Sequence, residues 1–405
     1  MSGAAPGGGS VSGAAPGVGS PRRAHPGGAP DGALRILMAT PPFTAVGPIP
    51  RLTALLVGEL ESLGCHVTTV DWGSGPGQTS ASQRSFGRLK DMRAVWRQAC
   101  ASSCDVVVVA SAHYRNTLAR DIPLMLGLRA ARQPAVLQFH GSQPEVLLRK
   151  GRPLFKLASR LLLAASSGIL VLSGEEKRAW ERFRPKTMVH VVKNPYGGIP
   201  GASAAAEAGE PQTPHTAQPP IILFVGRLLA FKGVYDLLEA AQRLATAHAE
   251  LPFQIVMAGD GPEAPAIAAL ADRLGIGARV VLRGQVDPQA LRALYRQATL
   301  FVLPSHLEGF PTVIAEAMDA GLPIVTTAIR GAVDYLEEGV NALLVPPREP
   351  ARLADALATL LADPELRGRM GEANRHKVSI FAPHKVAAEY LDVLRHIAGR
   401  TGTES

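Results

Sequence analysis

Short apolar runs rich in β-branched residues recur along this sequence, without the strict apolar–polar alternation of strands that have one wet face. In the first half they occupy residues 35–39, 66–70, 106–110, 135–139, 168–172 and 189–193. In the second half they occupy residues 221–225, 254–258, 279–282, 300–303, 323–327 and 343–345. Helical patterns such as 52–63 and 235–247 separate these runs. Strands buried on both faces with helices between them are typical of parallel sheets, so the pattern predicts an α/β fold.

Two low-complexity segments divide the chain. Residues 1–33 are rich in Gly, Ala, Pro and Ser, and we expect them to form a disordered tail. Residues 199–219 have a similar composition and are interpreted as a linker. The predicted units are therefore two doubly wound, Rossmann-like domains, at 34–198 and 220–385. Residues 386–405 are predicted to be a helix that returns to the first domain, followed by a tail.

Composition limits the class of protein and its setting. Among 405 residues there are three cysteines, which form no C-x-x-C pair and no even set, so no disulfide framework or zinc site is expected. The amino terminus has no apolar segment typical of a secretory signal, and the longest nearly apolar stretch, 161–172, is shorter than the roughly 20 residues that cross a bilayer. A reduced, cytoplasmic location is expected.

Positive charge is concentrated in the first half. Residues 34–198 contain 22 Lys and Arg against 10 Asp and Glu, whereas residues 220–405 contain 18 against 21. Two basic amphipathic runs stand out, and both favour contact with an anionic membrane surface and a lipid-linked acceptor. Their basic residues are Arg84, Arg88, Lys90, Arg93 and Arg97, and then Arg149, Lys150, Arg152, Lys156 and Arg160. The alternative is a solvated basic face, and no module typical of nucleic-acid binding is found, so that partner is not expected.

A glycine-bounded basic loop, GRLLAFKG, follows the predicted strand 221–225. Gly226 permits a tight turn, and Arg227 and Lys232 then present a guanidinium and an ammonium group beyond the strand end. Such cations suit a diphosphate, and the helix that follows adds its positive dipole end. The P-loop pattern GxxxxGK[ST] is absent. The alternative is a solvated basic loop.

Further polar loops follow other predicted strands of the second half. GDGPE (259–263) reads as a turn, and RGQV (283–286) places Gly284 where a flat base approaches the backbone. In SHLEGFPTVIAEAM, Glu316 lies inside a predicted helix and suits a vicinal diol such as ribose, while Glu308 in the loop suits a second polyol such as a hexose. The amides of Gly309 and Phe310 lie near the helix start. The alternative is that both glutamates are ordinary surface residues.

Together, GR-x4-KG, GDGPE, RGQV and E-x7-E occur in an order that resembles the retaining glycosyltransferases of family 4. The resemblance spans about residues 34–395 and implies the GT-B architecture, with two Rossmann-like domains facing a cleft. It implies a carboxyl-side domain that binds a nucleotide-diphosphate sugar and an amino-side domain that binds the acceptor. The residues that it implies for the donor are Arg227 and Lys232 for the diphosphate, Glu316 for the ribose, Glu308, Gly309 and Phe310 around the sugar, and Gly226, Gly284, Gln285 and Val286 near the base and the turn.

In the amino-side domain the resemblance implies a histidine beside the donor sugar, His140, and a glycine whose amide approaches phosphate, Gly47. Pro48 replaces a second glycine there and removes one N–H donor, although proline suits the first turn of a helix. Ser173 with Glu176 reads locally as a capping box. Asp334 departs from the family's pattern, in which a glutamate is commoner at that position.

These observations predict a metal-independent retaining glycosyltransferase of the hexosyl type. It would move a sugar to a hydroxyl of a glycan, lipid-linked or small-molecule acceptor, for example in polysaccharide biosynthesis. No Asp-x-Asp occurs in the chain, so no metal site and no cofactor are expected. The competing hypotheses are a nucleotide-sugar epimerase and a non-catalytic protein that binds sugar nucleotides.

Overall fold

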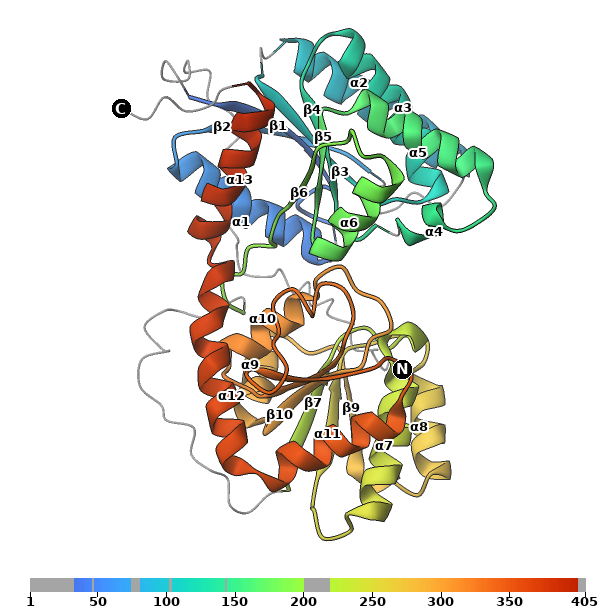
Figure 1. Cartoon of the computed structure of the whole chain (residues 1–405), viewed down its shortest axis with the longest axis vertical. Coiled ribbons are helices and arrows are strands. Elements are labelled where there is room, and N and C mark those ends of the chain that lie inside the picture. The colour runs from blue at the N-terminus through green and yellow to red at the C-terminus, as the bar shows by residue number, and fades with distance from the viewer. Residues whose placement is uncertain are drawn as a thin grey trace, which may run out of the picture.

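The computed structural model describes residues 33–45, 47–73, 81–101, 104–142, 144–199 and 219–399, with backbone alone for 81–89. These residues form two parallel six-stranded sheets, one above the other in Figure 1, each covered by helices. The predicted tail 1–33 lies outside the described residues except for residue 33. The predicted linker 199–219 lies outside them except for its two end residues. The side chains of Arg84 and Arg88, and the residues after 399, are also outside the described part.

The first sheet has the strand order β2-β1-β3-β4-β5-β6. Its strands are β1 (Arg35–Thr40), β2 (His66–Asp71), β3 (Val106–Ser111), β4 (Ala135–Phe139), β5 (Gly168–Val171) and β6 (Val189–Val191). Its helices are α1 (Pro48–Ser62), α2 (Ala81–Ala101), α3 (Arg115–Ala130), α4 (Glu145–Leu148), α5 (Pro153–Ala165) and α6 (Gly174–Phe183). Every residue of β3, β4 and β5 is buried, as a strand covered on both faces requires.

The second sheet has the strand order β12-β11-β10-β7-β8-β9. Its strands are β7 (Ile221–Val225), β8 (Gln254–Ala258), β9 (Val280–Gly284), β10 (Leu300–Leu303), β11 (Ile324–Thr327) and β12 (Ala342–Val345). Its helices are α7 (Val234–Ala247), α8 (Ala264–Arg273), α9 (Pro288–Gln297), α10 (Thr312–Asp319), α11 (Pro350–Ala362) and α12 (Pro364–Lys377). A strand stands at each of the runs expected from sequence, so the prediction of two Rossmann-like units is confirmed, with ends displaced by one or two residues.

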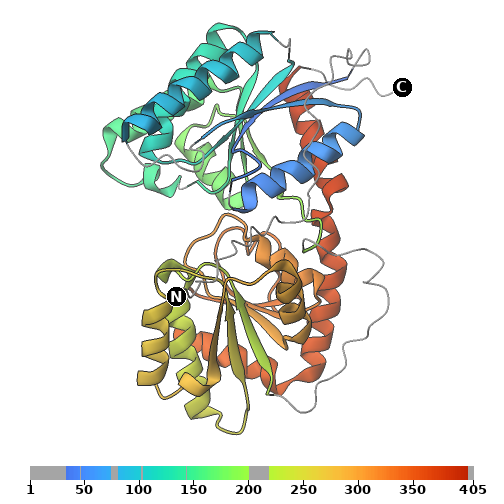
Figure 2. The ribbon, with the colours of Figure 1, turned by 180° about the vertical axis from the view of Figure 1, so that it is seen from behind.

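The carboxyl-terminal helix α13 (Pro383–Ile397) leaves the second unit and packs against α1 of the first. It follows α12 and a short 3-10 helix, η4 (Val378–Phe381), along one side of both units, as Figures 1 and 2 show. The hydroxyl of Tyr390 donates to the buried side chain of Gln138 on β4 at 3.0 Å. Nearby, Lys193 pairs with Glu389, and the chain crosses between the units where the amide of Tyr196 donates to Phe381 at 2.7 Å.

No helix within the described ranges combines the length and the apolar character that crossing a membrane requires.

The Tyr390–Gln138 hydrogen bond gives a test of how α13 is held. Replacing Tyr390 with Phe leaves a buried polar group without its partner, which costs about 1–3 kcal/mol. We expect the thermal midpoint, followed by circular dichroism, to fall by about 2–4 °C or more. The control is Glu389→Gln, because an exposed ion pair contributes little and the midpoint should hardly move. An equal effect of both substitutions would contradict this docking of α13.

Candidate functional site

The predicted site residues converge because β7 and β10 are neighbours in the second sheet. The strand order reverses between these two strands, since β7 continues to β8 on one side and β10 to β11 on the other. In open parallel sheets, ligands bind beyond the carboxyl ends of the strands at such a reversal. The loop with Arg227 and Lys232 follows β7, and the loop with Glu308 follows β10, so the reversal brings the two loops together.

The loop after β7 is held by the GDGPE turn after β8. The amide of Leu228 donates to the carbonyl of Asp260 at 3.0 Å. A side chain on Gly259 would place its Cβ 2.0 Å from the carbonyl oxygen of Gly226, and one on Gly261 would lie 2.2 Å from that of Leu228. The motif is therefore a turn, as expected, and its glycines permit this close approach. It fixes the backbone around Arg227, whose exposed side chain has no hydrogen-bond or ion-pair partner within the described ranges.

Lys232 and Glu308, which sequence reasoning assigned to different parts of a ligand, form an ion pair with each other. Gly233 allows this, because its φ is +71° and a Cβ there would lie 1.9 Å from the carbonyl oxygen of Pro304. Ser305 also donates to the Glu308 carboxylate at 2.8 Å. Both charged side chains are largely buried, yet an ammonium group has three N–H donors and can hold an anion besides this carboxylate.

The two residues after Glu308 have different roles. Phe310 is buried and its ring stacks on Phe381 at 4.8 Å, so only its backbone remains for a ligand. Gly309 faces the first unit, since a Cβ built on it would lie 3.4 Å from the Cα of Gly141 and 3.2 Å from Leu172. The carboxyl ends of both sheets therefore meet at Gly309.

Glu316 is the fifth of the eight residues of α10 and is 8% exposed. One carboxylate oxygen accepts a hydrogen bond of 2.9 Å from the Tyr295 hydroxyl on α9, which leaves the other oxygen for a ligand. Burial raises the pKa of the Glu316 carboxyl, while Tyr295 and the positive charge of Arg51 on α1 partly offset this. Sequence reasoning missed Tyr295 because its pairing depends on how α9 packs against α10.

The RGQV loop ends β9 at the same edge of the sheet. The carbonyl of Gly284 accepts a hydrogen bond from the amide of Gly259 at 2.8 Å, and nothing lies within 4 Å of a Cβ built on Gly284. Gln285 is exposed, whereas Val286 packs partly against the core. The open backbone at Gly284 is compatible with the predicted approach of a base.

In the first unit, His140 directly follows β4 and precedes Gly141. Its amide donates to the carbonyl of Ser111 at 3.3 Å. Burial lowers the pKa of the His140 imidazole to about 4, so the ring is neutral near pH 7. His140 therefore lies at the junction with Gly309 as an uncharged hydrogen-bonding group.

The loop at His140 is braced by the segment that sequence reasoning read as a capping box. Ser173 caps α6 as expected, accepting a hydrogen bond from the amide of Glu176 at 3.1 Å. The reciprocal half is wrong: the carboxylate of Glu176 accepts from the amide of Ser142 at 2.7 Å and from that of Leu172 at 3.2 Å. A buried carboxylate with several backbone donors holds the loop after β4 to the end of β5.

Gly47 stands at the amino-terminal cap of α1, and Pro48 is the first residue of that helix. The proline therefore occupies a position where its missing N–H is not needed within the helix. Nothing lies within 4 Å of a Cβ built on Gly47, so the cap is open. Arg51, one turn further on, donates to the carbonyl of Gly198.

Two further contacts that the sequence did not indicate join the units at this edge. Arg330, with a side chain 5% exposed, forms an ion pair of 2.7 Å with Glu145 on α4 and donates from Nε to the carbonyl of Glu308 at 3.2 Å. Asp334, the departure from the family's pattern, accepts a hydrogen bond of 3.1 Å from the amide of Gly174 at the start of α6. Both contacts hold the loop after β11 against the first unit, and Arg330 also binds the loop around Glu308.

Within the described ranges, no group of three or more His, Cys, Asp or Glu residues is placed so that it could hold a metal ion.

Residues 207–377 match the family model described as "Glycosyl transferases group 1". Among curated relatives, the alpha-D-kanosaminyltransferase of Streptomyces kanamyceticus is 31% identical over 251 residues, which cover 59% of this chain and 64% of that protein. The D-inositol 3-phosphate glycosyltransferase of Corynebacterium efficiens is 34% identical over 178 residues, covering 43% of this chain and 42% of that protein. The chain thus spans less than two thirds of either relative.

Solved structures match over a larger share of the chain. Sucrose-phosphate synthase from Thermosynechococcus elongatus superposes with a TM-score of 0.70 at 19% identity, covering 91% of this chain and 100% of that one. Anabaena HepE in complex with UDP-glucose gives a TM-score of 0.63 at 19% identity, and the match covers 90% of this chain and 100% of that one. The resemblance read from the sequence is confirmed: residues 207–377 match the model of the group 1 glycosyl transferases, and the two units have the GT-B fold.

Proposed function

We propose that this protein is a retaining glycosyltransferase that moves a hexose-type sugar from a nucleotide-diphosphate donor to a hydroxyl group of an acceptor, without a metal ion. The observation that carries the proposal is the placement of Arg227 and the Lys232–Glu308 pair on the loops that follow β7 and β10 at the strand reversal, opposite His140 and Gly141. Arg227 has no hydrogen-bond or ion-pair partner among the residues that the structure describes. Two cations there suit a diphosphate. The names of the curated relatives, which describe transfer of sugars, favour transfer over epimerisation.

Each part of the donor has a place in this proposal. Arg227 and Lys232 hold the diphosphate, the free oxygen of Glu316 accepts from the ribose, and Gly284, Gln285 and Val286 lie beside the base. Glu308 accepts from the sugar hydroxyls while it keeps its hydrogen bond with Ser305. Neutral His140 positions the sugar as a hydrogen-bond partner. The UDP and UDP-glucose complexes of Anabaena HepE support a donor of this chemical class.

Retention is proposed to follow from attack on the same face that the leaving group departs from. The acceptor oxygen forms a bond to the anomeric carbon as the bond from that carbon to the diphosphate oxygen breaks. The proton of the acceptor hydroxyl passes to the departing diphosphate. Arg227 and Lys232 stabilise the charge that develops there, a role that a divalent metal has in other enzymes.

The acceptor is proposed to bind on the first unit, at the edge formed by the ends of β1, β4 and β5. A glycan, a lipid-linked sugar and a small polyol all present the hydroxyl group that the reaction needs. The three cysteines are free thiols, which fits the proposed cytoplasmic location.

The proposed activity is tested by product analysis. Purified protein is incubated with UDP, GDP, ADP and dTDP sugars and with sugar, polyol and lipid-linked acceptors, in the presence of EDTA. We expect one donor family to yield a glycoside whose anomeric configuration, read by nuclear magnetic resonance, equals that of the donor. Inversion, or activity that EDTA abolishes and manganese restores, contradicts the proposal. Donor conversion without an acceptor would indicate an epimerase, and donor binding without turnover a non-catalytic protein.

Replacing Lys232 with Ala tests the charge on the leaving group. Losing one such contact removes about 2–4 kcal/mol of transition-state stabilisation, so we expect kcat to fall about 30- to 1,000-fold. Stopped assays at saturating donor measure this directly. The control is Lys385→Ala on α13, an exposed lysine away from the site, which should leave kcat unchanged. Near-normal turnover of Lys232→Ala would contradict the assignment.

Replacing Glu316 with Gln tests whether the buried negative charge of this side chain lowers the stability of the fold. Because the folded-state pKa of Glu316 is raised, its contribution to stability is present below the ordinary value of 4.5 and is lost as pH rises through the folded pKa. Gln avoids this loss and can still accept from Tyr295. We expect the thermal midpoint of the variant to exceed that of the wild type at about pH 8, with the difference vanishing towards about pH 4.

The same variant should bind the donor more weakly, because a carboxylate accepts hydroxyl hydrogen bonds more strongly than an amide does. We expect an affinity lower by about 10- to 100-fold, measured by calorimetry. Glu372→Gln on α12, where the carboxylate is exposed, is the matched control and should change neither quantity. A variant less stable than the wild type at every pH, with unchanged donor affinity, would show that Glu316 is purely structural.

A further inference from the structure

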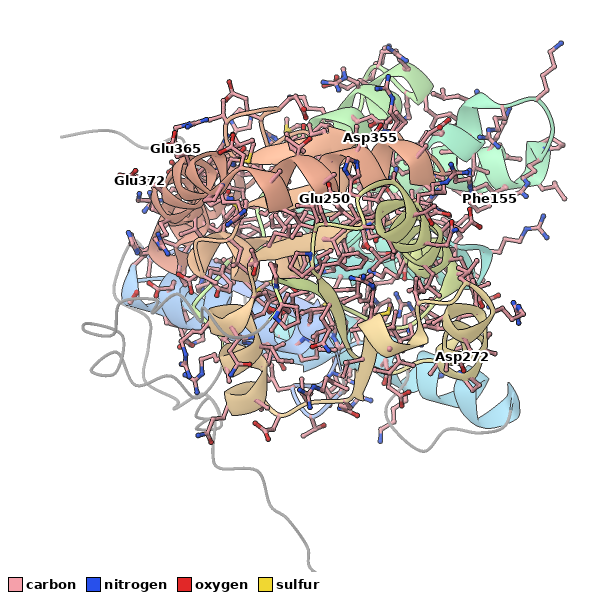
Figure 3. All side chains as sticks on the ribbon, turned by 90° about the horizontal axis from the view of Figure 1, so that it is seen from below. Phe155, Glu250, Asp272, Asp355, Glu365 and Glu372 are labelled. Carbon is pink, nitrogen blue, oxygen red and sulfur yellow. The ribbon has the colours of Figure 1, made fainter. Side chains whose placement is uncertain are left out.

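The outer side of α4 and α5 carries a surface that is both apolar and basic. Its exposed leucines are Leu148, Leu154, Leu157 and Leu161, with exposed fractions of 44%, 81%, 63% and 43%. Its basic residues are Arg149, Lys150, Arg152, Lys156 and Arg160. We call these residues the α4–α5 surface. In Figure 3 the region around Phe155 projects beyond the outline of the second unit, with side chains ending in nitrogen extending outward from it.

Helix α5 has two apolar faces, and among the residues that the structure describes only one of these faces has a packing partner. Leu162 and Leu163 are buried against the first sheet and its helices. Leu154, Leu157 and Leu161 lie at intervals of three and four residues, so they share one face of the helix. A helix on the surface of a globular protein normally has polar residues on that face. Exposed apolar stretches of this kind mark interaction surfaces.

The charge on this surface has a single sign. No Asp or Glu occurs between residues 146 and 174, and Glu145 is already paired with Arg330. Within the described ranges none of the five cations forms an ion pair. Lys156 donates to the carbonyl of Arg149 at 2.6 Å, and Arg160 lies over the ring of Phe183. The surface is therefore complementary to an anionic partner.

We propose that the α4–α5 surface docks onto an anionic lipid bilayer. The leucines enter the boundary between headgroups and acyl chains, and the Lys and Arg side chains contact lipid phosphates while their methylene stems cover apolar surface. A helix lying in the plane of the interface, with leucines on one face flanked by cations, is typical of this binding mode.

The docked orientation bears on the reaction. Glu145 on α4 pairs with Arg330, and Arg330 donates to the carbonyl of Glu308, so one side chain connects the α4–α5 surface to the candidate donor site. Figure 1 shows α4 at the margin of the first unit that faces the second. If the proposed function holds, docking brings the junction of the units close to the bilayer, which fits an acceptor anchored in lipid.

The test is co-sedimentation of the full-length protein with vesicles of phosphatidylcholine, alone or with about 30% phosphatidylserine. We expect the wild type to bind the anionic vesicles at about 0.05 M salt and to be released by about 0.5 M salt, which shortens the screening length. Arg149→Gln with Lys150→Gln should lower the partition coefficient by about 25-fold, or about fivefold for each cation. Leu154→Ser with Leu157→Ser should also lower the partition coefficient measured at about 0.05 M salt, although all five cations remain.

Matched controls come from exposed residues elsewhere. Arg352→Gln with Arg369→Gln removes two exposed cations from the second unit, and Leu63→Ser removes a leucine that is 43% exposed at the end of α1. Neither change should affect partitioning. Donor-nucleotide binding, measured on the same preparations, should be unchanged in every variant. This readout separates failure of the docking proposal from failure of the proposed function.

Three outcomes would overturn the proposal. The first is no binding of the wild type to anionic vesicles at low salt. The second is displacement by a soluble glycerophosphodiester, which would show a discrete headgroup site rather than a docked surface. The third is a dimer in analytical ultracentrifugation that Leu154→Ser with Leu157→Ser dissociates, without vesicle binding, which would make a second copy of the chain the partner.

Discussion

The pairing of β7 with β10 is the constraint on which the candidate site depends. Because the strand order of the second sheet reverses there, loops that are 76 residues apart in sequence place Lys232 and Glu308 in one ion pair. The GDGPE turn fixes the loop after β7 through backbone contacts that only glycines permit. The topology of the sheet thus builds the site. The basic loop after β7 forms a candidate ligand site only because the loop after β10 lies beside it.

The second level of organisation is the contact between the two units. Arg330 and Asp334, both from the loop after β11, reach Glu145 and the start of α6 in the first unit. Gly309 lies against Gly141 at the same edge. These contacts set His140 opposite the loop around Glu308, while α13 joins the units along one side through Tyr390 and Gln138. Positioning of this kind is what a reaction between two bound substrates requires.

The strands and the loops that follow them were predictable, because buried parallel strands have a local signature and the loops at their ends are short. The residues that tune the site were not. Tyr295 is recognised only when α9 packs on α10, and the Arg330–Glu145 pair joins positions 185 residues apart. Of the two hydrogen bonds in the predicted capping box, only the one that Ser173 accepts is formed. The Glu176 carboxylate instead accepts from the amide of Ser142, in the loop after β4. Local pattern specifies elements, whereas partners of buried polar groups depend on tertiary packing.

The central claim is that Arg227 and Lys232 bind a diphosphate without a metal ion. The most direct measurement is calorimetric titration of the protein, in EDTA, with a nucleoside, its monophosphate and its diphosphate. The account predicts that the diphosphate binds about 10- to 100-fold tighter than the monophosphate, and that Arg227→Gln removes most of this gain. Equal affinity for monophosphate and diphosphate, or a gain that appears only with added manganese, would contradict it.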